Sequence, residues 1–157
     1  MTLTPHALLL AAGLAAATLA GCSAGGGGGG ALSAGLTQRM DTPGANLNRA
    51  EALGIVNHFR SASGSTQLAA DAGLDATAQS LATAYAQSGT APKSPAGSIG
   101  MRSSAGYPNF AETFSGWRNS PADAAVLTER TATKAGVGVA YDPSSTYGVY
   151  WVLLLDD

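Results

Sequence analysis

The segment Tyr147–Leu155, close to the end of the chain, is apolar at nearly every position. A β-strand directs alternate side chains to opposite faces. Here the two sets are Tyr147, Val149, Trp151, Leu153 and Leu155 against Tyr150, Val152 and Leu154. A strand that is apolar on both faces must be covered on both, and only the helices upstream are available as cover. We therefore predict an α+β fold, a three-layer α-β-α sandwich with a central antiparallel sheet.

A second strand is predicted just before this segment. Ala135–Tyr141 alternates, with Val137, Val139 and Tyr141 on one side, and Asp142–Thr146 is a turn that joins the two strands. A domain of this size buries an adequate core without disulfides.

Four stretches are predicted to be helices because their apolar residues recur at helical spacing and their ends carry capping residues. They are Asn48–Ser63, Asp71–Gly89, the run from Phe110 to the Ser120-Pro121 stop, and Pro121–Arg130. In the third helix Phe110, Phe114 and Trp117 share one face, and Asn109 is placed to cap its start. We expect this helix to fill a core rather than to carry catalysis.

Two segments lack a helical pattern. Ala31–Asn46 is predicted as an extended lead-in with a turn at Asp41–Gly44. Thr90–Pro108 is predicted as a loop with a short strand near Ser98–Arg102. A loop of this length in a small domain is either functional or poorly ordered.

The N-terminus is typical of an exported protein. Met1–Ala20 holds an apolar run that ends in small residues, which indicates a signal peptide rather than a spanning helix. The tetrad that follows, Leu19-Ala20-Gly21-Cys22, resembles the lipobox of bacterial lipoproteins. That resemblance implies that Cys22 is diacylated on its sulfur and becomes the mature N-terminus. Ser23 is not the aspartate associated with inner-membrane retention, which favours the outer membrane.

A run of glycines, Gly25–Gly30, follows the cysteine and predicts a flexible tether. The expected organisation is a lipoprotein signal peptide at 1–21, an acylated cysteine with tether and lead-in at 22–46, and a domain at 47–157. Cys22 is the only cysteine, so no intrachain disulfide can form. Charge is sparse, with a net value of −2 and no basic patch, so we expect no nucleic-acid partner.

Four motifs follow one another along the chain. They are Asn57-His58-Phe59-Arg60 with Gly64, Leu68-x-x-Asp71-x-x-Leu74 followed by Ala78, Ala82 and Ala86, Gly116-Trp117-Arg118-Asn119-Ser120-Pro121, and Gly136-Val137-Gly138-Val139 with Tyr150-Trp151. In order and spacing they resemble the CAP superfamily (cysteine-rich secretory, antigen 5, pathogenesis-related; SCP-like) in its short bacterial form without disulfides. The resemblance covers roughly Ala31–Leu155 and implies the same α-β-α sandwich.

The resemblance also implies a cleft in which two histidines and two acids often hold a divalent metal. The matching positions here are Met101, Ser120 and Asp123, and neither His6 nor His58 matches a cleft position. A metal site needs converging ligands, and only one carboxylate remains. We therefore expect no metal, no cofactor and no catalytic residue, and we retain these three positions as cleft candidates.

Three functions are compatible with the sequence. The first is a lipid-anchored, non-catalytic binding domain of the bacterial cell envelope, facing the periplasm. Its partners would be the membrane and an apolar, peptide or cell-wall ligand. The second is a hydrolase that uses Asp123 or Glu112 with Ser120. The third is a purely structural envelope protein, which the sequence does not separate from the first. We favour the first.

Overall fold

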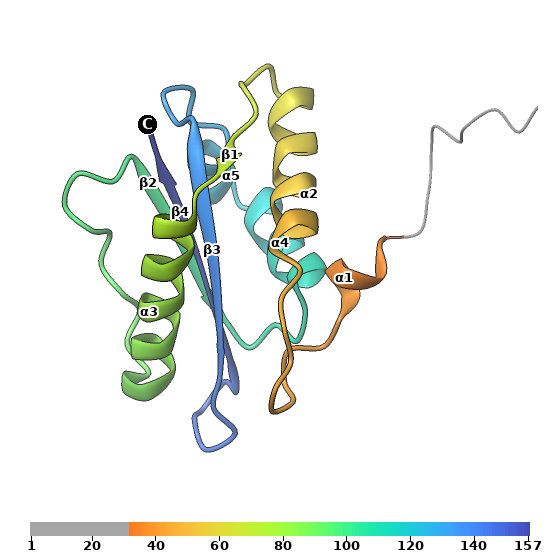
Figure 1. Ribbon diagram of the computed structural model, residues 1–157, viewed down its shortest axis with the longest axis vertical. Coiled ribbons are helices and arrows are strands. Elements are labelled where there is room, and N and C mark those ends of the chain that lie inside the picture. Colours follow the sequence, from red (N-terminus) through yellow and green to blue (C-terminus); the bar gives the residue numbers. More distant parts are fainter. Residues whose placement is uncertain (1–31) are drawn as a thin grey trace, which may run out of the picture. The chain divides into compact units, whose positions relative to one another are not determined.

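A computed structural model describes residues 32–157 of the chain (Figure 1). The predicted signal peptide, Cys22 and the predicted glycine tether lie outside the described residues. The helices are α1 Ala34–Thr37, α2 Arg49–Ala62, α3 Ala72–Ser88, α4 Phe110–Asn119 and α5 Pro121–Leu127; the strands are β1 Ala69–Ala70, β2 Gly100–Ala105, β3 Lys134–Tyr141 and β4 Val149–Asp156. No helix among these residues has the length and apolar character needed to cross a membrane.

The four strands form one sheet in the order β1-β3-β4-β2. β4 lies between β3 and β2 and is antiparallel to both, whereas β1 pairs with β3 in parallel. The central antiparallel sheet predicted from the sequence is therefore confirmed. Every residue from Val149 to Leu155 is buried, as expected for a strand covered on both faces.

Helices cover the two faces of the sheet, so the three-layer sandwich is also confirmed. α3 lies on one face, where Ala78 and Ala82 pack against Val152 and Leu154. α2, α4 and α5 lie on the other, where most of the core is found (Figure 1). The side chain of Trp117 on α4 is only 2% exposed, in agreement with its predicted place in the core.

Two glycines of β3 let α3 approach the sheet closely. A Cβ built on Gly136 would lie 2.1 Å from the carbonyl carbon of Leu74, and one on Gly138 would lie 2.3 Å from that of Ala78. Both distances are far below van der Waals contact, so the helix backbone occupies the space of the missing side chains. This close approach is the physical reason for the Gly-Val-Gly motif.

The ends of α3 and the start of α4 follow the predicted capping residues, and α2 begins one residue after the predicted Asn48, which caps it. The side chains of Asn48, Asp71 and Asn109 accept hydrogen bonds from main-chain N–H groups in the first turns of α2, α3 and α4. Gly89 ends α3 in the left-handed conformation with φ 67°. α5 stops at Leu127, before the predicted Arg130.

Three features differ from the prediction. The lead-in contains α1 and is not wholly extended, because Leu36 and Met40 turn into the core. β2 runs on to Ala105, because β4 offers it partners as far as Tyr150. β1 has only two residues and gave no periodic signal.

Candidate functional site

The family-matched positions lie around β2 and the junction of α4 with α5. Ser120 ends α4 and precedes α5, and its side chain caps neither helix. Asp123 is in the first turn of α5. Its carboxylate forms an ion pair with Arg102 of β2, and both side chains are a little over one quarter exposed, at 28% and 29%. The guanidinium neutralises this acid and occupies one of its oxygens.

Met101 does not join Asp123. It lies opposite Leu154 in the register of β2 with β4, whereas Arg102 lies opposite Leu153. Directly paired residues share a face of the sheet, and Met101 packs with the cluster under α3. The sheet therefore separates Met101 from Asp123. Sequence reasoning also missed the role of Arg102 as the partner of Asp123.

Two further candidate residues, Glu112 and His58, do not join the ion pair of Asp123 with Arg102. Glu112 accepts a 2.6 Å hydrogen bond from the side chain of Asn109, within the capping of α4. His58 is an exposed residue of α2. Within residues 32–157, no three His, Cys, Asp or Glu side chains form a group that could hold a metal ion.

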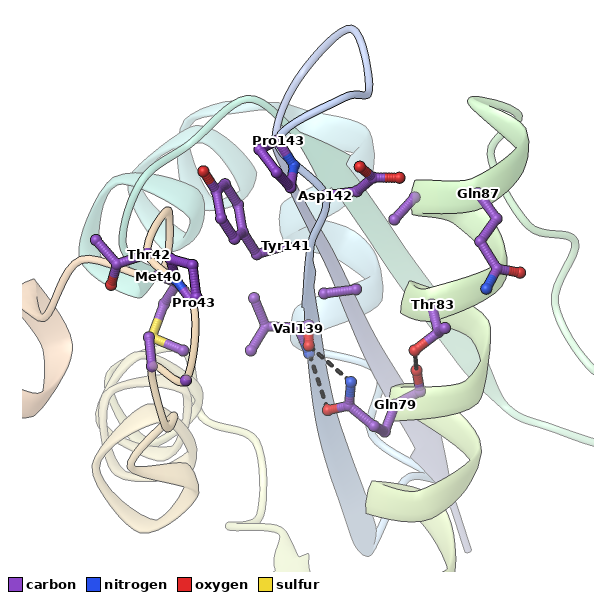
Figure 2. A pocket seen from close by; sticks show the side chains of 14 residues that line it. Met40, Thr42, Pro43, Gln79, Thr83, Gln87, Val139, Tyr141, Asp142 and Pro143 are labelled. Carbon is purple, nitrogen blue, oxygen red and sulfur yellow. Dashed lines mark hydrogen bonds between the residues drawn. The ribbon is translucent and has the colours of Figure 1, made fainter.

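An open cleft of ≈ 500 Å³ lies instead along the edge of β3 (Figure 2). Three segments far apart in the sequence line it. They are Met40 with residues 42–45, the part of α3 from Gln79 to Gln87, and the end of β3 with the residues that follow it, from Val139 to Pro143. The sequence predicted neither this cleft nor its residues, although the turn at Asp41–Gly44 and the aromatic residue at the end of the strand were visible.

The two walls of the cleft differ in chemistry. On the α3 side, Gln79, Thr83 and Gln87 lie four residues apart (Figure 2). Thr83 and Gln87 present a hydroxyl and an amide group, whereas the amide of Gln79 is bonded to the main chain of Val139. On the opposite side, Pro43 offers exposed apolar surface, whereas Met40 is only 3% exposed. A ligand held here would contact both polar and apolar groups, as is usual for small-molecule sites.

Polar side chains cap the main chain along the edge of β3 at Val137 and Val139. Asp75 accepts a 2.8 Å hydrogen bond from the N–H of Val137, and Arg49 donates a 2.9 Å bond to the carbonyl of Val137. Gln79 donates a 2.7 Å bond to the carbonyl of Val139 and accepts from its N–H at 3.4 Å. An unpaired strand edge is thus closed by three polar side chains.

Among the described residues that line the cleft, Asp142 is the one carboxylate. Its Oδ1 accepts hydrogen bonds from the Ser144 hydroxyl at 2.6 Å and from the Ser144 main-chain N–H at 2.9 Å. These bonds hold the pKa of the Asp142 carboxyl below its usual value, and the hydroxyl has the larger effect. Asp142 is therefore ionised at neutral pH.

A second hollow, of ≈ 380 Å³, shares Tyr141 and Pro143 with the cleft. Its lining includes the ion pair of Arg39 with Asp41. Tyr147 also lines it and is 56% exposed. The end of the β3–β4 hairpin therefore carries polar and aromatic surface on both sides.

The sequence profile of the Cysteine-rich secretory protein family, CAP, matches residues 53–155. The chain therefore belongs to the CAP family. No curated protein matches the sequence.

Solved structures share the fold at low sequence identity. MpPR-1i is 18% identical with a TM-score of 0.57, over 68% of this chain and 88% of that one. An extracellular protein with an SCP domain from Bacillus anthracis is 20% identical with a TM-score of 0.58, over 70% of this chain and 40% of that one. A cysteine-rich secretory protein from Staphylococcus aureus is 13% identical with a TM-score of 0.50, over 69% of this chain and 38% of that one. This chain thus spans less than half the length of the two bacterial proteins.

Proposed function

We propose that this chain is a lipid-anchored CAP domain of the bacterial cell envelope and that it binds a ligand without transforming it. The observation that carries the binding role is the open cleft at the β3 edge, ≈ 500 Å³ in volume. Such a volume suits a small ligand or a short segment of a larger one. An apolar molecule, a peptide or a cell-wall component would fit this description.

The arrangement of acids favours binding over catalysis. General acid–base catalysis usually pairs two titratable groups around the reacting atoms. Asp123 is engaged by Arg102, whereas Asp142 lines the cleft along the edge of β3, which Asp123 does not line. The two carboxylates therefore do not converge on one substrate.

The envelope location is supported by the Leu19-Ala20-Gly21-Cys22 tetrad and the glycine run that follows it. One CAP-fold relative, from Bacillus anthracis, is extracellular. Acylation of Cys22 would attach the domain to a membrane on the periplasmic side, and Ser23 favours the outer membrane.

Two measurements test the proposal. In bacteria fed an alkyne analogue of palmitate, we expect the full-length chain to take up label and sediment with the envelope, and Cys22→Ala to do neither. We also expect one class of envelope-derived compound to raise the melting temperature saturably and to be recovered with unchanged mass. If the wild-type chain takes up no label, the proposed lipid anchor is wrong. If the ligand is recovered as a cleaved product, the proposed non-catalytic binding role is wrong.

A further inference from the structure

The main-chain groups of Tyr141 point out of the sheet at the edge of β3. Asp142 donates its N–H to the carbonyl of Gly148 in the hairpin with β4, at 2.8 Å. In an antiparallel pair the residues that bond to the partner alternate with residues that do not. Tyr141, directly before Asp142, therefore directs its N–H and C=O away from β4, as Val137 and Val139 do.

These two groups are the first on the edge that the side-chain caps do not reach. Arg49, Asp75 and Gln79 cap Val137 and Val139. β1 pairs only with Lys134 and Ala135. Within residues 32–157, no hydrogen bond involves the N–H or C=O of Tyr141. Tyr141 lines the cleft. Its main-chain N–H and C=O, spaced as in any β-strand, therefore face the space between the two walls.

An extended peptide satisfies such a pair of groups. Its own N–H and C=O bond to the edge as an added strand would. Alternate side chains of the peptide then point to opposite sides, toward Pro43 on one side and toward Thr83 and Gln87 of α3 on the other. The two-sided chemistry of the cleft matches this alternation.

Charge at the cleft selects among peptides. Asp142 is ionised, and its Oδ2 accepts neither of the bonds from Ser144, which both go to Oδ1. None of the ion pairs formed among residues 32–157 includes Asp142. Its carboxylate is directed toward the α3 side, in the direction of Gln87 (Figure 2). A cationic group on the ligand would complement it.

We propose that the cleft binds a short extended peptide with a free ammonium group. The peptide adds to the β3 edge at Tyr141, and its ammonium group pairs with Asp142. This inference rests on the proposed binding function and names the ligand class and the site.

The test uses the full-length chain in detergent, labelled with ¹⁵N, and three peptides. Acetyl-Ala-Lys-Ala-amide carries a side-chain ammonium, Ala-Ala-Ala-amide carries a terminal one, and acetyl-Ala-Ala-Ala-amide is neutral. We expect at least one charged peptide to shift the Tyr141 and Asp142 amide signals saturably and to slow hydrogen exchange at the N–H of Tyr141. The neutral peptide should bind about fivefold more weakly, the effect of one partly exposed ion pair.

Asp142→Asn should reduce the affinity for the charged peptide to that for the neutral one. Asp157→Asn is the matched control, because it removes the same charge at the end of the chain. Equal binding of all three peptides, shifts confined to another surface, or no binding would overturn the proposal. The proposal would also be overturned if an N-acetylglucosamine trimer, and none of the peptides, shifted the Tyr141 and Asp142 signals. Labelling with the palmitate analogue does not depend on peptide binding, so failure of peptide binding can be distinguished from failure of lipid anchoring.

Discussion

Arg60 of α2 donates a 2.7 Å hydrogen bond from Nη1 to the main-chain carbonyl of Leu127, at the end of α5. The same buried guanidinium donates to the carbonyls of Thr66, at 2.8 Å, and Ala132, at 3.2 Å. One side chain therefore joins the loop after α2 to the end of α5 and to the loop that follows α5. Arg60 belongs to one of the motifs that resemble the family, and its role here is structural.

Arg60→Met is expected to destabilise the domain by about 3 kcal/mol or more, because each buried carbonyl left without a donor costs roughly 1–3 kcal/mol. The stability of Arg60→Lys should lie between that of the wild type and that of Arg60→Met, because an ammonium lacks the planar fork that reaches three acceptors. Urea unfolding of each variant measures the change. Arg130→Met is the control, since Arg130 is exposed, and it should change stability by no more than about 0.5 kcal/mol. An equal loss in both variants would contradict the role of Arg60.

Gly138→Ala should destabilise the domain, because its Cβ would lie 2.3 Å from the main chain of α3. Overpacking of this kind usually costs about 1–3 kcal/mol, and a backbone neighbour puts the expected value at the upper end. Gly54→Ala in α2 is the matched control, because nothing lies within 4 Å of its added Cβ. This variant should gain up to about 1 kcal/mol from helix propensity. Melting temperatures that move in opposite directions would support the close approach of α3, and a neutral Gly138→Ala would exclude it.

The helix ends, the core helix with Trp117 and the two-sided strand were all predictable, because each depends on local signals. Asn48, Asp71 and Asn109 cap helices from within four residues of the groups that they bind. The apolar run of β4 likewise carries its own evidence of double cover.

The site was harder to predict because it depends on register and on distant segments. A shift of one residue in β2 would exchange the faces of Met101 and Arg102, and the sequence does not fix this register. The cleft requires Met40, Gln79 and Tyr141 to meet, and no local pattern specifies that contact. The Tyr141 edge becomes visible only when the caps on Val137 and Val139 are known.

The carboxyl of Asp142 should titrate below the ordinary value of 3.8, because Ser144 bonds to its charged form. Since the pKa is lowered in the folded state, its contribution to stability is present above the unfolded pKa and is lost as the pH falls through the folded value. Ser144→Ala should move the midpoint back toward the ordinary value. Carbon-detected NMR titration of the side-chain carboxyl measures both midpoints. A wild-type midpoint above that of Ser144→Ala would contradict the assigned cause.

The ion pair of Arg102 with Asp123 makes a prediction about metal at the family-matched position. A guanidinium already bound to the carboxylate competes with a divalent cation, and a stable zinc site needs several converging ligands. In calorimetric titration of zinc into residues 31–157, which form one compact unit, we expect no saturable heat that depends on Asp123. Asp123→Ala should therefore give the same isotherm as the wild type and lose at most about 1 kcal/mol of stability, the usual value of a partly exposed pair.

If the wild type binds no zinc, the variant Arg102→Met shows whether Arg102 or the lack of further ligands is the reason. If this variant binds zinc and the double variant with Asp123→Ala does not, Arg102 is what keeps metal from this position. If wild-type binding is saturable, one-to-one and absent in Asp123→Ala, the acid acts as a metal ligand despite its partner, and the non-catalytic reading of the domain would have to be given up.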